Sequence, residues 1–279
     1  MSVKIVTDSA ADLTQEYLDK LIRVPLSVSF GDEEFFDGVT ISHKEFYEKL
    51  IESDELPRTS QATPAAFEEV FEQAKKDGDE VVVLTLSSKL SGTYQSAMIA
   101  AADYDNVCVV DTMTVAIAQG ILAVLALQLA DEGMDAKTIA ARLEEEKEKV
   151  CLIAMLDTLE YLKKGGRISA AAAFAGGVLS IKPVITVKDG VVEMLGKARG
   201  SKQGNNLLVK EIEKAGGADF SKPLLLGYTG LTDVLLNKYI ADSAYIWEGN
   251  VSQLKTTTIG SAIGTHAGPG AIAVAFFKK

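Results

Sequence analysis

The sequence predicts an α/β protein of two domains, the first with a parallel sheet covered by helices and the second with a mixed sheet. Three observations lead to this fold class. The 279 residues exceed the usual size of one domain. Apolar runs alternate with helical segments through the first half, as in parallel sheets connected by helices. A hairpin lies among helices in the second half, so we place the domains at residues 1–155 and 156–279.

The elements of the first half follow from the period of apolar residues and from capping signals. Ser42 and Glu45 form a capping box, and Thr63 with Pro64 begins a helix that Gly78 ends. The nearly continuous apolar run 81–86 indicates a strand covered on both faces. We predict strands at 3–7, 23–30, 81–86 and 107–110, and helices at 14–22, 42–53, 65–76, 92–102, 113–130 and 136–149.

The second half combines one clear hairpin with several helices. Asp189-Gly190 is a turn signal between two strand-like runs. We predict strands at 150–155, 182–188, 191–198, 224–228, 244–247 and 271–276, and helices at 157–163, 169–180, 203–215 and 232–242. The alanine-rich stretch 170–177 has little side-chain bulk, so it either lines a tunnel or packs closely against neighbouring helices.

Composition and charge exclude several classes of protein. A net charge of −11 argues against a nucleic acid partner, because neutralising phosphates requires a basic surface. Asp8 comes too early for a secretory signal, so we expect a cytoplasmic location. Residues 113–130 carry no charge but contain polar residues, which favours a buried helix over a membrane span and leaves at most a transient membrane contact. Two cysteines in apolar runs indicate neither a zinc site nor a disulfide framework.

Residues 87–97 place hydroxyl groups and a glycine between a predicted buried strand and a helix. Ser91 is the expected N-cap of this helix, whose first turn presents unpaired backbone N–H groups and the positive end of the helix dipole. An anion could bind there without a lysine, and Gly92 would let a ligand approach the backbone. The alternative is that Ser91 only caps its own helix.

Two further clusters are candidates for the same site. Thr59-Ser60-Gln61 precedes a helix and, in a parallel sheet, would lie at the edge where ligands bind in open α/β folds. The glycine-rich segment 260–270 contains Thr265 and His266, which suggests a tight loop built around a ligand. The alternatives are an ordinary helix start and a structural histidine. The other histidine, His43, is expected to be solvated.

Arg167 and Arg199 each lie near glycine in an otherwise acidic chain. Arginine suits the planar recognition of a carboxylate or phosphate, or a partner interface, and surface ion pairing is the alternative. Several chemistries can be set aside, because the chain has no GxxxxGK[ST], GxGxxG or GxSxG motif. Nucleophilic catalysis would require Ser91 and His266 to meet in space.

Taken in order, these segments resemble the bacterial DegV family of fatty-acid-binding proteins. The matches run along almost the whole chain, and the ordered set is specific although each single motif is weak. The matching segments are Thr7-Asp8-Ser9-Ala10-Ala11-Asp12-Leu13, Thr59-Ser60-Gln61, residues 87–97, Val110-Asp111, Leu159-Glu160-Tyr161-Leu162, Gly165-Gly166-Arg167-Ile168, Lys182-Pro183 and Gly264-Thr265-His266-Ala267-Gly268-Pro269-Gly270.

The resemblance implies an N-terminal three-layer α/β/α domain and a smaller, two-layer C-terminal α/β domain, with an acyl chain in an apolar tunnel between them. It implies that the hydroxyls of Thr59 and Ser91 and a backbone N–H near Gly92 hold the fatty acid carboxylate. His266 and Thr265 would stand close to the same head group. A long-chain fatty acid is then the ligand, and no metal or other cofactor is expected.

Members of this family with a known role are the lipid-presenting, non-catalytic subunit of bacterial fatty acid kinase. A separate kinase subunit phosphorylates the bound carboxyl group to an acyl phosphate. Arg167 and Arg199 match positions around the head group and the kinase contact, so the resemblance implies that they dock the partner. The alternatives are an enzyme, either a serine hydrolase using Ser91 with His266 or a phosphotransferase, and a sensor whose lipid is structural.

Overall fold

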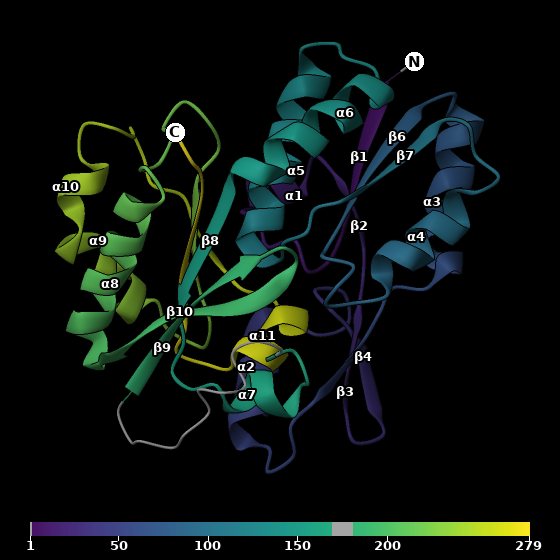
Figure 1. Ribbon diagram of the computed structural model, residues 1–279. Coiled ribbons are helices and arrows are strands. Elements are labelled where there is room, and N and C mark those ends of the chain that lie inside the picture. The colour runs from purple at the N-terminus through teal and green to yellow at the C-terminus, as the bar shows by residue number, and fades with distance from the viewer. Residues whose placement is uncertain (1, 169–180) are drawn as a thin grey trace.

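The computed structural model describes residues 2–168 and 181–279 of the chain. It contains two α/β units built on separate sheets, and a small third sheet, so the predicted fold class is confirmed (Figure 1). The expected helix at 169–180, with the alanine-rich stretch 170–177, lies outside the described residues.

The first sheet has four parallel strands in the order β2-β1-β6-β7. They are β1 (Val3–Asp8), β2 (Ile22–Val24), β6 (Glu80–Thr85) and β7 (Val107–Asp111). Helices α3 (Pro64–Asp77) and α4 (Thr93–Ala101) cover one face, and α5 (Ala116–Asp131) and α6 (Ala136–Glu146) cover the other. Because both faces are covered, β6 is apolar along nearly its whole length. The predicted three-layer arrangement is confirmed.

The second sheet is mixed and has six strands in the order β10-β9-β8-β13-β11-β12. They are β8 (Val150–Met155), β9 (Ile181–Lys188), β10 (Val191–Arg199), β11 (Leu225–Tyr228), β12 (Thr256–Thr258) and β13 (Ile272–Phe277). β9 and β10 form the predicted hairpin. One face packs against α8 (Gly200–Lys214), α9 (Val234–Asp242) and α10 (Ala244–Trp247).

Helix α5 packs between the two sheets, as the middle of Figure 1 shows. Ile117 and Ile121 share one core with Leu84 of the first sheet and with Leu225 and Ala275 of the second. Eleven of its 16 residues are buried, which explains the uncharged run at 113–130. In the part of the chain that the structure describes, no helix is long and apolar enough to cross a membrane.

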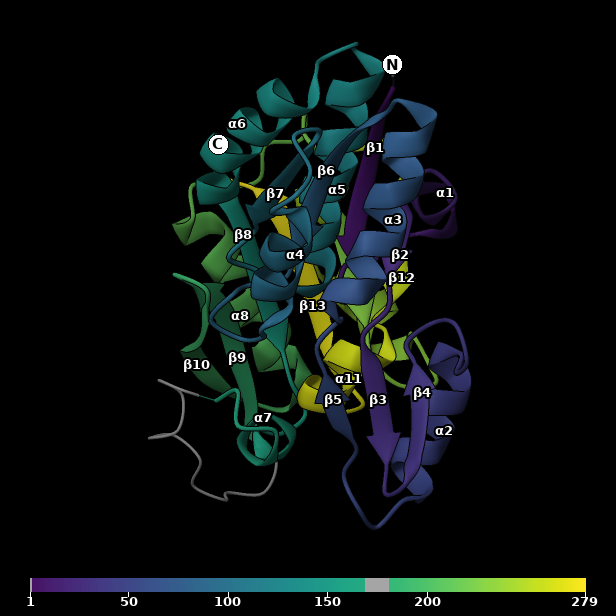
Figure 2. The ribbon, with the colours of Figure 1, turned by 90° about the vertical axis from the view of Figure 1, so that its right-hand side faces the viewer.

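The third sheet is antiparallel, in the order β4-β3-β5, and it packs against α2 (His43–Glu52) and α11 (Ser261–Ala267) (Figure 2). Its strands are β3 (Ser27–Phe30), β4 (Glu33–Phe36) and β5 (Arg58–Ser60). The single strand expected at 23–30 is divided at Pro25, which cannot donate to a ladder, so β2 and β3 belong to different sheets. The short elements are α1 (Gln15–Leu18), a 3-10 turn (Lys147–Lys149) and α7 (Glu160–Lys164).

Several sequence-based expectations need correction. Residues 244–247 form helix α10 rather than a strand, and the expected loop at 260–270 contains helix α11. Strand β8 lies inside the range assigned to the first domain but pairs with β9 and β13. The change from one sheet to the other therefore comes before Val150, while the division of the domains at residue 155 stays a prediction.

Gly120 of α5 lies close to the backbone of Asp12. A Cβ atom at this position would stand 2.4 Å from the carbonyl oxygen of Asp12 and 3.1 Å from Leu13 Cδ2. Because a backbone atom cannot rotate away, Gly120→Ala is expected to lower the free energy of unfolding by about 2–3 kcal/mol in urea titrations. The control Gln128→Ala, on the exposed side of α5, should change it by less than ~0.5 kcal/mol. Equal midpoints for the two variants would contradict this packing.

Candidate functional site

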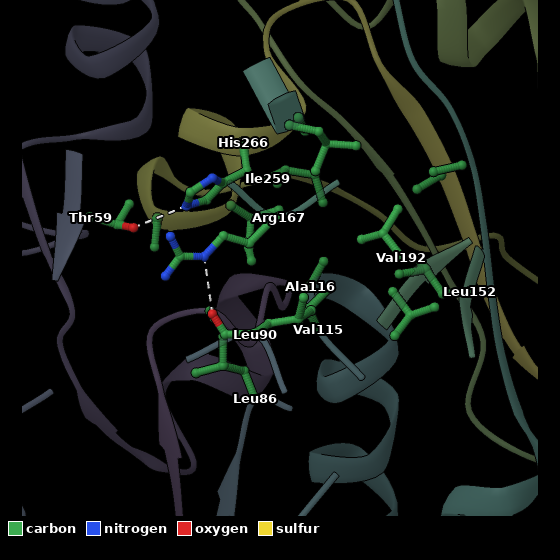
Figure 3. Close-up of a pocket in the computed structure, with 18 of the residues that line it drawn as sticks. Thr59, Leu86, Leu90, Val115, Ala116, Leu152, Arg167, Val192, Ile259 and His266 are labelled. Atoms are coloured by element: carbon green, nitrogen blue, oxygen red, sulfur yellow. Dashed lines mark hydrogen bonds between the residues drawn. The ribbon is translucent and has the colours of Figure 1, made fainter. Parts of the chain in front are cut away.

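An apolar cavity of about 390 Å³ lies where the two larger sheets and the third sheet meet. Its volume is within the range of roughly 300–1,000 Å³ that is typical of small-molecule sites. Most of its lining is apolar and includes Leu86, Val115, Leu152, Val192 and Ile259, which are drawn in Figure 3. Such a surface is suited to a hydrocarbon, because burying apolar surface is favourable.

Polar residues from distant parts of the chain line the same cavity. They include Thr59 of β5, Ser91 before α4, Arg167 after α7 and His266 of α11, and Gly92 lines the cavity beside Ser91. Figure 3 shows Thr59, Arg167 and His266 grouped at one end, with Leu152 and Val192 toward the other. The structure therefore brings together four of the five residues expected to bind the ligand, and it adds Arg167.

Thr59 and His266 are in hydrogen-bond contact, with 3.0 Å between Thr59 Oγ1 and His266 Nε2. Burial, followed by the nearby charge of Arg167, lowers the pKa of His266 from 6.5 to about 4, so the ring is neutral at pH 7. Its Nδ1 atom has no partner among the described residues. Gly165 makes room for the ring, since a Cβ there would lie 2.2 Å from Nδ1.

The start of α4 differs from the expected arrangement. Gly92, and not Ser91, is the N-cap residue, so that detail of the prediction is wrong. The Ser91 hydroxyl accepts from Thr93 N–H at 3.3 Å, lies 2.9 Å from Thr93 Oγ1 and faces the cavity. A Cβ at Gly92 would stand 2.0 Å from Gln61 Oε1, so glycine is needed for Gln61 to pack here. Gln61, which belongs to the candidate cluster Thr59-Ser60-Gln61, also lines the cavity.

Arg167 lies in the cavity wall, whereas we expected it to contact a partner. Its Nε donates to the carbonyl oxygen of Leu90 at 3.1 Å, and its Nη1 donates to that of Gly165 at 2.8 Å. Two carbonyls from separate elements thus hold the guanidinium beside His266 (Figure 3). A fixed positive charge in a mostly apolar cavity favours an anionic ligand group.

Two other expected residues lie elsewhere. Thr265 is 3% exposed, and its hydroxyl donates to the carbonyl oxygen of Ser261 at 2.9 Å, one turn earlier in α11. It is therefore directed into its own helix and is not among the described residues that line the cavity.

Arg199 is exposed at the end of β10, where its backbone N–H donates to Gln203 Oε1. Arg199 also lies outside the cavity lining, so any role must be at the surface.

A family model described as "Uncharacterised protein, DegV family" matches residues 2–279. The chain belongs to the DegV family. A DegV domain-containing protein from Caldanaerobacter subterraneus subsp. tengcongensis is 34% identical over 282 residues, which cover 99% of each chain. The family resemblance drawn from the ordered motifs is therefore confirmed.

Solved structures of DegV proteins share this fold. The chain is similar to a DegV family protein from Thermus thermophilus whose structure concerns fatty acid binding, with a TM-score of 0.90 and 32% identity over 100% of both chains. It is also similar to a stearic-acid-binding protein from Eubacterium ventriosum, with a TM-score of 0.87 and 29% identity over 100% of this chain and 99% of the other.

Within this DegV fold, Ser91 and His266 both line the cavity but are bonded to different described residues. The imidazole of His266 bonds to Thr59, whereas the Ser91 hydroxyl is engaged with Thr93. No carboxylate orients His266 Nδ1 in the described part of the chain, although a catalytic histidine normally has such a partner. Across residues 2–168 and 181–279, no cluster of three His, Cys, Asp or Glu side chains could hold a metal ion.

Two buried carboxylates attach α11, which carries His266, to the N-terminal region. Asp12 Oδ1 accepts from Gly260 N–H at 2.6 Å, and Asp37 Oδ1 accepts from the N–H and hydroxyl of Ser261. Burial raises the pKa of Asp12 well above its usual value. The sequence indicated Asp12 only as a possible helix cap and as part of the first matching DegV segment, and it indicated no role for Asp37. Their function is to hold the helix that positions His266.

Proposed function

We propose that this DegV protein binds a long-chain fatty acid, with the carboxylate at the polar end of the cavity and the acyl chain along the apolar walls. The observation that carries the proposal is the gathering of Thr59, Ser91, Arg167 and His266 at one cavity that is mostly apolar. The similarity of this chain to solved fatty-acid-binding DegV proteins supports the same class of ligand.

The proposed carboxylate contacts follow from the donors at this end. The hydroxyls of Thr59 and Ser91 and the backbone N–H at Gly92 donate to the carboxylate oxygens, and Arg167 balances the charge. His266 is neutral without ligand, and it supports Thr59 through their hydrogen bond. Each buried methylene of the chain adds about 0.8 kcal/mol, so the apolar walls supply most of the affinity.

We further propose that the chain presents the fatty acid to a separate kinase subunit, which phosphorylates the carboxylate to an acyl phosphate. Ser60 and Gln61 are exposed and also line the cavity, so its polar end reaches the surface at β5. A partner could therefore approach the carboxylate while the acyl chain stays covered. The chain itself would be non-catalytic, Arg199 would contact the partner, and the exchange would take place in the cytoplasm, where ATP is supplied.

The proposal is tested by mass spectrometry of organic extracts from the purified protein, followed by titration of the delipidated protein with a fatty acid. We expect a bound fatty acid, and we expect Ser91→Ala to weaken binding about 10-fold because a hydrogen bond to a charged group is lost. The control is Ser88→Ala, an exposed serine in the same loop, which should bind as the wild type does. Protein that carries no lipid and binds none in titration would overturn the proposal.

A further inference from the structure

The floor of the cavity is a face of the second sheet, and its side chains change in size along the strands. Residues two apart on a strand point to the same face, about 7 Å apart. Gly227, Ala273, Ala154 and Ile185 pair in sequence across four neighbouring strands, and all four line the cavity. Three of them carry a methyl group or less, so this row leaves space above the sheet.

The polar end of the cavity lies beyond this row on the side where β8 ends. Leu156, two residues after Ala154, and Ala271, two residues before Ala273, line the cavity in that direction. Leu156 is followed by α7 and Arg167, and Ala271 follows α11 with His266. Gly165 and His266 are in contact, so α7 and α11 come together there. The strands of the floor therefore run from the proposed carboxylate site toward the opposite end of the cavity.

At the opposite end the floor becomes bulky. Leu152, two residues before Ala154, and Val187, two residues after Ile185, line the cavity in this direction. Val192 also lines it and pairs with Val187 across the hairpin. Figure 3 places Leu152 and Val192 away from Thr59 and His266. Leu152 is 5% exposed and belongs to β8, which is hydrogen-bonded to strands on both sides. Such a side chain cannot move aside easily, because its backbone is held in the middle of the sheet.

The turn of the hairpin closes the space beyond these residues. The Ser87 hydroxyl donates to the carbonyl oxygen of Gly190 at 2.8 Å, which joins the hairpin to the first α/β unit. A Cβ at Gly190 would stand 2.6 Å from Ser87 Oγ and 2.9 Å from Met113 Cε, so the contact is close. The cavity therefore ends where three bulky side chains meet a closed interface.

We propose that Leu152, Val187 and Val192 form an end wall that limits the length of the acyl chain. This inference rests on the proposed function and adds the residues that select the substrate within its class. A chain longer than the floor must leave methylenes outside the apolar walls or displace the end wall. Each methylene that is not buried forfeits about fourfold in affinity, so the wall sets an upper length rather than a lower one.

The test compares two neighbouring residues of β8 that point to opposite faces. Leu152→Ala enlarges the cavity, whereas Ile153→Ala removes a similar volume from the core on the other face of the sheet. The full-length proteins are delipidated, incubated with an equimolar series of saturated fatty acids of increasing chain length, and extracted for mass spectrometry. We expect Leu152→Ala to retain chains about two to three methylenes longer than the wild type does, and Ile153→Ala to keep the wild-type profile.

A third variant tests the row of small residues that leads to the end wall. Ala273→Leu fills the row of small residues, so we expect its profile to shift toward shorter chains. Thermal unfolding of each variant separates a change in chain preference from a loss of folding. Wild-type profiles in Leu152→Ala and Ala273→Leu, or equal shifts in Leu152→Ala and Ile153→Ala, would overturn the end wall alone. A wild-type protein that retains no fatty acid of any length overturns the proposed function as well.

Discussion

The Arg167→Ala variant is expected to bind a long-chain fatty acid about 100-fold more weakly than the wild type. In the proposed complex the half-buried Arg167 balances the carboxylate charge, and removing it costs about 2–5 kcal/mol because the carboxylate is left without a counter-charge in a mostly apolar cavity. Arg167 is the cation that two carbonyl groups fix at the polar end of the cavity. Isothermal titration of delipidated protein with a fatty acid measures the change directly.

A matched arginine separates ligand binding from partner docking. Arg199 is exposed and lies outside the cavity, so Arg199→Ala should leave fatty acid affinity unchanged. The same variant should slow acyl phosphate formation when a fatty acid kinase subunit and ATP are added. Arg167→Lys keeps the charge but loses the planar fork, so it should bind between the wild type and Arg167→Ala. Affinity within a factor of about three of the wild type in Arg167→Ala would refute the assigned role.

The largest effect on stability is expected for Asp8→Ala, with a loss of about 3–5 kcal/mol in the free energy of unfolding. Asp8 is fully buried and accepts three hydrogen bonds, from Leu86 N–H at 2.7 Å, Ala10 N–H at 3.0 Å and Gln119 Nε2 at 3.2 Å. These bonds join the end of β1 to the loop after β6 and to α5. Truncation leaves the N–H groups of Leu86 and Ala10 buried without an acceptor, while Gln119 Nε2 keeps only its bond to the carbonyl oxygen of Leu84. Chemical denaturation measures the cost.

The pH dependence of stability provides a second test of Asp8. Burial raises its pKa from 3.8 to about 6, so between these values the folded protein holds a proton that the unfolded chain has released. The stability that this proton contributes is present at pH 4 and is lost as the pH rises through 6. Asp8→Asn cannot titrate, so the stability of the wild type relative to this variant should fall by roughly 2 kcal/mol from pH 4 to pH 7.

The difference between the two proteins isolates Asp8 from the other buried groups. The lowered pKa of His266 contributes a slope of opposite sign, but it is present in both proteins and cancels. A wild-type advantage that stays constant, or that grows with rising pH, would show that Asp8 is ionised throughout this range in the folded state.

Several parts of the fold were predictable because their signals are local. The capping box of Ser42 with Glu45 and the start of α3 at Thr63-Pro64 depend only on nearby residues, and the structure confirms both. The hairpin around Asp189-Gly190 is equally local.

The small third sheet was not predicted, because β3 pairs with β5 across a long separation in sequence and neither strand is strongly apolar. Helix α11 was taken for a loop because glycines are poor helix formers, yet it is stabilised by packing against α2 and by the hydrogen bonds that its first N–H groups donate to Asp12 and Asp37.

By itself, the sequence determined the α/β class, the parallel first sheet, the DegV family and four ligand-site candidates, Thr59, Ser91, Gly92 and His266. These follow from short motifs and from apolar periodicity, which persist in any arrangement of the chain. Only the tertiary structure decided that Arg167 lies in the cavity wall and that Thr265 turns back into its helix. Those outcomes depend on which elements meet and on which face a side chain lies, and no local pattern encodes a contact between residues so far apart in the chain.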